Sequence, residues 1–99
     1  MATPEGRVKA KISAVLKARN IPYVMPIQTG YGRPGISDYI CCVNGRFVAV
    51  EAKVDSKSPI RPTQKIFMKE ITDAGGEAIV VHKDNIADLE KLLDKLQSL

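Results

Sequence analysis

Apolar residues recur every three to four positions in three segments of the chain, the spacing typical of an amphipathic helix. These segments cover residues 4–19, 62–74 and 84–97. Thr3 and Pro4 suit the start of the first helix, and Asp84 suits the start of the third as its cap. Gly75 suits the end of the second helix. The inward residues of that second helix are predicted to be Ile66, Phe67, Ile71 and Ala74.

Shorter runs of β-branched and aromatic residues predict strands over residues 36–43, 46–54 and 77–81. Residues 23–27 form a further extended piece, and Pro22 before it and Pro26 within it suit the edge of a sheet. A loop with a permissive backbone follows it, marked by Gly30, Gly32, Pro34 and Gly35. The resulting order, α-β-β-β-α-β-α, predicts an α/β fold with a mixed central β-sheet flanked by helices.

The small size of the chain limits what it can contain. Its 99 residues and 10.8 kDa allow a single domain over residues 1–99. Trp is absent and only five residues are aromatic, so the modest core favours a homodimer. No apolar stretch is long enough to cross a bilayer and the N-terminus is polar, so we expect a cytoplasmic protein without a membrane partner. The adjacent Cys41 and Cys42 cannot bridge each other on a strand, and we expect both to be reduced and buried.

The positive charge is unevenly distributed. Residues 1–53 carry eight Lys and Arg against three acids, whereas residues 54–99 carry seven against eight, and the net charge is +4. A basic N-terminal half favours a polyanionic partner, most simply nucleic acid. A basic surface without a partner would have the same composition, so the charge alone does not decide between the two.

Asn44-Gly45 is a strong signal for a hairpin turn, and the turn fixes the pairing of the two strands. Cys42 then faces Phe47, and the same register puts Asp38 directly opposite Glu51, with Cβ atoms about 5 Å apart. Both faces of this hairpin are mainly apolar, which predicts a central position in the sheet.

Two opposed carboxylates repel each other, and a cation would remove the conflict. Lys53 lies on the same face as Glu51, two residues further along the strand. Carboxylates and carbonyl oxygens suit a hard ion such as Mg²⁺ or Mn²⁺. The alternative is structural: Lys53 neutralises Glu51, and Asp38 caps a turn.

Asp38 followed on the next strand by Glu51-Ala52-Lys53 resembles the signature of the PD-(D/E)xK nuclease superfamily, and in detail its virus-type replication-repair nuclease (VRR-NUC) domain. The similar residues are Gly32-Arg33-Pro34-Gly35-Ile36-Ser37-Asp38, Phe47-Val48-Ala49-Val50-Glu51-Ala52-Lys53, Ser58-Pro59, Gln64 and Gly75-Gly76-Glu77-Ala78-Ile79-Val80-Val81. Ser37 departs from the proline that the family usually has before the aspartate. The resemblance implies a restriction-endonuclease-like core.

The resemblance also implies roles for individual residues. Asp38 and Glu51 would bind a divalent metal, Mg²⁺ or Mn²⁺, together with the carbonyl of Ala52, and no nucleotide cofactor is implied. Glu5 matches an acid that the family places near the metal, although an acid is favoured in the first turn of any helix. Catalysis would involve Asp38, Glu51, Lys53 and Gln64, with Lys53 positioning the attacking water. Gln64 could otherwise be a satisfied core amide.

Several basic and aromatic residues are candidates for binding DNA. Arg7 and Lys11 share one edge of the first helix, and Arg61 and Lys65 share one edge of the second. Tyr31 and Arg33 belong to the glycine loop before Asp38. Each set could instead be an ordinary solvated surface. His82 follows a strand, and we interpret it as a strand-end residue rather than a general base.

The leading hypothesis is therefore a metal-dependent DNA endonuclease. The resemblance suggests branched DNA, such as a four-way (Holliday) junction, as the substrate of a homodimer, and a phage or mobile-element origin would suit the small chain. A non-catalytic nucleic-acid-binding module and a restriction-type nuclease subunit are the alternatives.

Overall fold

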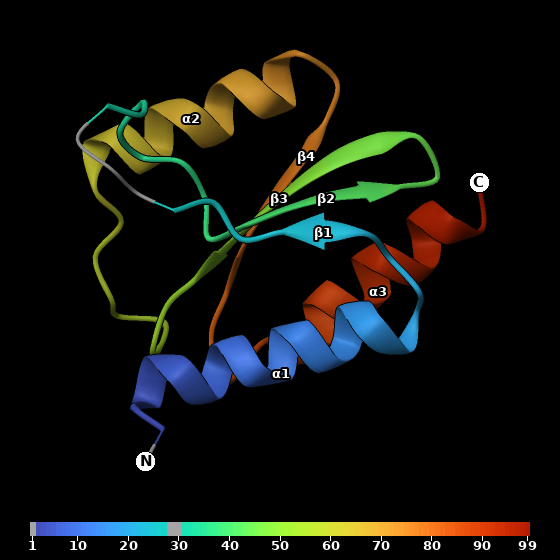
Figure 1. The fold of residues 1–99 in the computed structure, drawn as a ribbon, viewed down its shortest axis with the longest axis horizontal. Helices are drawn as coiled ribbons and strands as arrows, with labels where there is room; N and C mark the ends of the chain where they lie inside the picture. Colours follow the sequence, from blue (N-terminus) through green and yellow to red (C-terminus); the bar gives the residue numbers. More distant parts are fainter. Residues whose placement is uncertain (1, 28–30) are drawn as a thin grey trace.

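The computed structural model describes residues 2–27 and 31–99, and Figure 1 shows a sheet with helices packed against it. The predicted order of elements is confirmed: α1 (Pro4–Ala18), β1 (Tyr23–Val24), β2 (Tyr39–Val43), β3 (Arg46–Ala52), α2 (Pro62–Asp73), β4 (Glu77–Val81) and α3 (Ile86–Gln97). Gly30, predicted to lie in the glycine loop, is outside the described residues.

The four strands form one mixed sheet, as predicted, in the order β1-β2-β3-β4. β1, β2 and β3 are antiparallel neighbours, whereas β4 runs parallel to β3. A parallel neighbour requires a crossover connection, which α2 provides. β2 and β3 each have a strand on both sides, so the predicted central position of the hairpin is confirmed.

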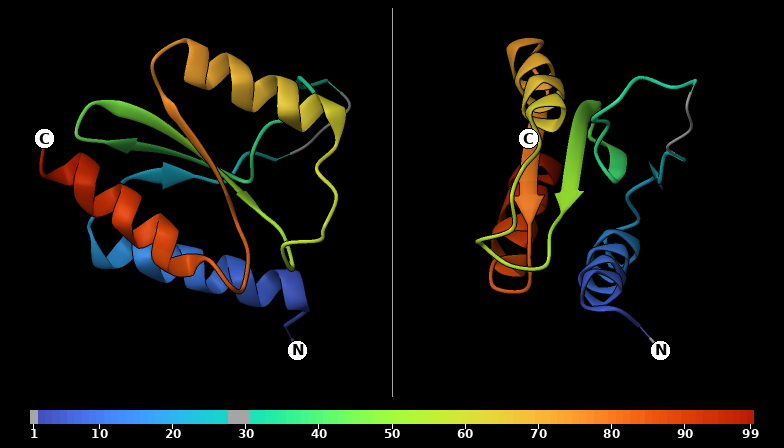
Figure 2. Two further views of the ribbon diagram at one scale, coloured as in Figure 1. Left: turned by 180° about the vertical axis from the view of Figure 1, so that it is seen from behind. Right: turned by 90° about the vertical axis from the view of Figure 1, so that its left-hand side faces the viewer.

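The helices cover the two faces of the sheet unequally. α1 and α3 lie side by side, and α2 lies apart from both (Figure 2). The main core forms between α1, α3 and one sheet face, from residues that include Ile12, Leu16, Tyr39, Val48, Val50, Leu89 and Leu93. α2 covers the opposite face along β3 and β4, where Phe67 and Gln64 are buried. Among the described residues, no helix lies on the part of this face that belongs to β1 and β2.

The hairpin turn has the backbone geometry that Asn-Gly predicts. Asn44 and Gly45 have φ angles of +51° and +80°, both in the left-handed region that this turn requires. The predicted register is also observed, with Cys42 opposite Phe47 and Tyr39 opposite Val50. β2 begins at Tyr39 and not at residue 36, so Asp38 lies one residue before the last pair of the ladder.

Four smaller predictions were wrong. Ile66 and Ala74 are exposed, because the face of α2 that packs on the sheet is narrower than the predicted apolar face and has Gln64 and Phe67 as its buried residues. α3 begins at Ile86, after Asn85, so Asp84 does not cap it. Cys42 is exposed, because α2 covers only the β3 and β4 part of its sheet face, whereas Cys41 is buried as predicted.

Among the described residues, no helix is long and apolar enough to span a membrane.

Candidate functional site

A pair of carboxyl groups, those of Asp38 and Glu51, lies where β2 begins and β3 ends, near the starts of α1 and α2. Asp38 Oδ2 accepts a hydrogen bond from the backbone N–H of Ala52, at 2.8 Å. The Asp38 side chain thus bonds across to β3 just beyond the last ladder pair, and this contact holds it beside the end of that strand. The alternative in which Asp38 caps a turn is not what the structure has.

Glu51 is a buried acid, with only 3% of its surface exposed. Burial raises the pKa of its carboxyl, and the hydrogen bond with Asp38 and the negative charge of Asp38 raise this pKa further. The positive charges of Lys53 and Arg61 offset part of this effect. The net effect raises the pKa of Glu51 from its usual 4.5 to about 8.

The amide of Gln64 connects Glu51 to Lys53. Its Nε2 donates to Glu51 Oε2 at 3.0 Å, and its Oε1 accepts from Lys53 Nζ at 3.1 Å and from the Arg61 backbone N–H at 3.0 Å. The opposite amide orientation would set the NH₂ group against two donors, so these contacts fix the orientation. No ion pair joins Lys53 to Glu51 in the described part of the chain, which argues against simple neutralisation of Glu51 by Lys53.

The start of α2 sets the position of Gln64. Arg61 is the N-cap of α2 and Gln64 is the third helical residue, so the bond from the Arg61 N–H to Gln64 is half of a capping box. The Gln64 side chain therefore caps the start of α2 and at the same time contacts both Lys53 and Glu51. Gln64 thus contacts two of the residues with which the resemblance groups it, and its catalytic role remains a prediction.

Gly35 allows the loop before Asp38 to pack on the same helix start. It has a φ of +79°, and a Cβ atom there would lie 2.3 Å from the carbonyl oxygen of Thr63. Any other residue would push the loop away from α2. Gly35 therefore places Asp38 and Gln64 in one site, although they come from different elements.

α1 approaches the site from the other side through Lys9. Lys9 Nζ lies 3.7 Å from Asp38 Oδ1 and 3.9 Å from Glu5 Oε2. The buried hydroxyl of Tyr39 donates to the Lys9 carbonyl at 2.9 Å and fixes this part of the helix. The sequence analysis did not identify Lys9, and the only local signal was its i, i+4 spacing from Glu5.

Glu5 itself stays at the margin of the site. Its side chain is 51% exposed, and Lys9 lies between it and Asp38. Across residues 2–27 and 31–99, no three His, Cys, Asp or Glu side chains are close enough together to hold a metal ion. The metal-binding role of Glu5 therefore remains a prediction.

The candidate DNA-binding residues differ in whether their side chains already contact other parts of the protein. Arg33 donates to Glu70 at 2.6 Å and lies 5.1 Å from the ring centre of Phe67, so it is tied to α2. Tyr31 is exposed in the glycine loop. Arg61 and Lys65 are exposed at the start of α2, and the charge of Arg61 reaches Glu51.

Arg7 and Lys11 lie away from the carboxyl pair. They line a depression beside Lys83, a residue that the sequence analysis did not select. His82 Nδ1 accepts from the Asp84 backbone N–H at 3.2 Å, a local contact in keeping with a strand-end residue.

Comparison with known proteins supports the fold. The structure is similar to a solved structure of a VRR_NUC domain, with a TM-score of 0.72 and 24% sequence identity over 98% of this chain and 97% of that chain. No protein-family model matches the sequence, and no curated protein matches it either. The α/β fold with a mixed sheet that the resemblance implied is confirmed: the chain has the fold of a VRR_NUC domain.

Proposed function

We propose that this protein is a metal-dependent nuclease that hydrolyses phosphodiester bonds of DNA. The observation that carries the proposal is the buried Glu51 carboxyl, held against Asp38 on one side and joined through Gln64 to Lys53 on the other. A chain that needed only a stable sheet would gain nothing from two adjacent acids, one of them buried. The VRR_NUC fold supports the same function.

The chemistry of the donors fits Mg²⁺ or Mn²⁺, since all of them are oxygens. Asp38 and Glu51 would supply carboxylates. Ala52 donates its N–H to Asp38, and the N–H and C=O of one strand residue point the same way, so its carbonyl is a reasonable third donor. A divalent ion bound by these groups would polarise the phosphate and lower the pKa of an attacking water.

Lys53 is proposed to position that water and to balance negative charge at the scissile phosphate. Gln64 accepts one hydrogen bond from the Lys53 ammonium, which limits where the group can move while its other protons remain available. Arg61 and Lys65 are exposed on the same helix start and are proposed to contact neighbouring phosphates.

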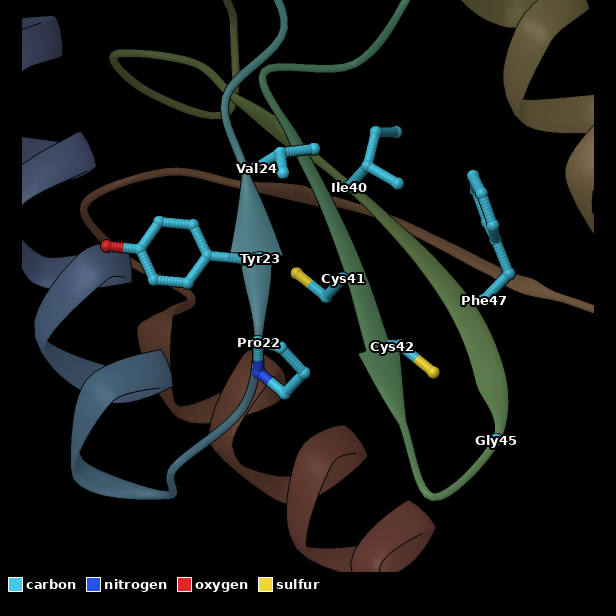
Figure 3. Close-up of a pocket in the computed structure, with 8 residues that line it drawn as sticks. All are labelled: Pro22, Tyr23, Val24, Ile40, Cys41, Cys42, Gly45 and Phe47. Carbon is cyan, nitrogen blue, oxygen red and sulfur yellow. The ribbon is translucent and has the colours of Figure 1, made fainter.

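We further propose that the protein acts as a homodimer on branched DNA. An apolar depression of about 450 Å³ lies over β1, β2 and β3, where Val24, Ile40 and Phe47 come from adjacent strands (Figure 3). Val24 and Phe47 are 61% and 42% exposed, which is unusual for side chains of this size on a sheet face. A second copy of the chain would bury this surface and set two active sites in two-fold symmetry, suited to a four-way junction.

Cleavage assays test the activity directly. Labelled linear, flap and four-way junction DNA would be incubated with the protein and Mg²⁺, Mn²⁺ or EDTA. We expect cutting with a divalent ion, none with EDTA, and a preference for the junction. Binding to all three substrates without cutting under any condition would instead identify a non-catalytic DNA-binding module.

The dimer has its own test. Light scattering coupled to size exclusion would measure the mass of the native chain and of Val24→Asp. We expect a dimer that the aspartate converts to a monomer. A native monomer at micromolar concentration would refute the dimer and leave the nuclease proposal intact.

A further inference from the structure

A second concave surface lies on the far flank of α1 from the carboxyl pair. It has a volume of about 430 Å³ and is formed by the first turns of α1 and the segments that follow β3 and β4. Its lining residues are Pro4, Arg7, Val8, Lys11, Val54 and Lys83. Three of the six are cations and none is an acid. We refer to it as the basic depression.

The three cations of the basic depression are not neutralised. Within residues 2–27 and 31–99, the side chains of Arg7, Lys11 and Lys83 make no ion pair and no hydrogen bond. Other cations of the chain, such as Arg19 and Arg33, are held by carboxylates. Positive charges gathered in a concave surface reinforce one another and attract an anion.

The backbone of α1 adds to this potential. Pro4 and Arg7 belong to the first turns of the helix, where its dipole is positive. Val8 and Val54 supply an apolar floor, against which the aliphatic parts of the cationic side chains can pack. Among the described residues that line the depression none is aromatic, so it has no aromatic platform for a nucleobase. These features suit a phosphate backbone and not a nucleobase.

The position of the basic depression relative to the candidate active site follows from helix geometry. Lys9 reaches Asp38, and both Arg7 and Lys11 are two residues away from Lys9, about 200° around the helix axis. Val54 follows Lys53 directly along the chain. The basic depression and the active site therefore occupy opposite flanks of α1 at the same end of the molecule.

We infer that the basic depression binds a phosphodiester segment of DNA beyond the segment that is cut, through Arg7, Lys11 and Lys83. This inference rests on the proposed function for the identity of the anion. Its contacts are charge contacts with the backbone, so they add affinity without sequence preference. A strand bound in both places bends around the N-terminal end of α1, which a flexible branch point permits more readily than a straight duplex.

The test measures DNA binding in EDTA, where no cleavage can occur. Fluorescence anisotropy with junction DNA over about 50 to 200 mM salt gives the slope of log K against log salt, close to 0.9 for each phosphate contacted. We expect Arg7→Ala/Lys11→Ala/Lys83→Ala to weaken binding and to lower this slope by about 2 to 3. The unfolding midpoint of each variant confirms that it is folded.

The matched control is Lys17→Ala/Lys91→Ala/Lys95→Ala. It removes the same charge from exposed lysines that also lack ion pairs in the described structure. We expect its salt slope to stay near the native value. An unchanged slope in the Arg7/Lys11/Lys83 variant, or an equal fall in both variants, would overturn the inference.

Two further arms identify the anion and separate the two proposals. If inorganic phosphate binds the native protein and not the variant, while both proteins bind DNA with the same salt slope, the depression is a free-phosphate site and the inference is overturned. Cleavage of junction DNA is measured in parallel with Mn²⁺. If the native protein never cuts, although the variant lowers the salt slope as expected, the nuclease proposal is refuted. If the native protein cuts, but the variant has the same salt slope as the native protein, only the inference about the basic depression is refuted.

Discussion

Replacing Glu51 with glutamine should stabilise the metal-free protein at alkaline pH. The neutral amide has nearly the shape of a protonated carboxyl. It can accept from Gln64 Nε2 as Glu51 Oε2 does, and can donate toward Asp38. Glu51→Gln therefore keeps the contacts of the site and removes the buried negative charge that forms when Glu51 loses its proton.

The sign of the pH dependence follows from the raised pKa. The pKa of Glu51 is raised from 4.5 to about 8 by burial and by Asp38, so the folded chain binds more protons than the unfolded chain between these values. The native protein therefore loses stability as the pH rises through this window. A tenfold change in proton affinity is worth about 1.4 kcal/mol, so we expect a loss of about 3 to 5 kcal/mol across this window.

Urea unfolding at several pH values measures this difference. Near pH 4 the native protein and Glu51→Gln should be about equally stable, and near pH 9 the variant should be more stable by about the amount given above. Glu77→Gln removes the same charge from a residue that is only partly buried and should follow the native curve. A constant difference between Glu51→Gln and the native protein across the range would refute the account of the carboxyl pair.

Manganese extends the same experiment to the metal. At pH 8, Mn²⁺ at about 100 times its dissociation constant should stabilise the native protein by about 2.7 kcal/mol. Glu51→Gln lacks one carboxylate and should gain much less. Equal stabilisation of both proteins would place the ion elsewhere.

Other predictions address the supports of the site. Gln64→Leu leaves its buried hydrogen-bond partners unsatisfied and should lower the free energy of unfolding, measured in urea, by about 2 to 3 kcal/mol. A loss smaller than about 0.5 kcal/mol would show that the hydrogen bonds of the Gln64 amide add little to stability. Gly35→Ala should cost more than Gly45→Ala, since both have positive φ but only the first meets backbone atoms, and equal unfolding midpoints would contradict this. Lys9→Met removes a cation next to Asp38 and should tighten Mn²⁺ binding up to about fivefold by calorimetry; weaker binding would show that Lys9 helps to hold the site.

Local signals predicted the elements of this fold well. The Asn44-Gly45 turn fixed the pairing of the hairpin, because its backbone requirement leaves one favoured register. That register placed Asp38 and Glu51 near each other before any contact was known. Gln64 could be singled out because a polar residue on an apolar helix stripe needs a partner.

Tertiary contacts account for what the sequence did not reveal. Asp84 looked like a cap, but Asn85 precedes the helix and its side chain bonds the end of β4, at the Val80 carbonyl and the His82 N–H. Lys9 meets Asp38 only because the first turns of α1 come near the residue that precedes β2. Lys83 approaches α1 from a loop more than seventy residues away in sequence, so no spacing rule connects them.

Asp38, Glu51 and Lys53 are proposed to form the active centre of a metal-dependent nuclease. The most direct measurement is the single-turnover rate of junction cleavage with Mn²⁺ for the native protein, Asp38→Asn and Lys53→Met, with Lys91→Met as a control of equal charge. We predict a loss of about 100-fold or more in the first two variants, with unfolding midpoints that show both are folded, and a native rate in the control. Native rates in Asp38→Asn and Lys53→Met would contradict the account.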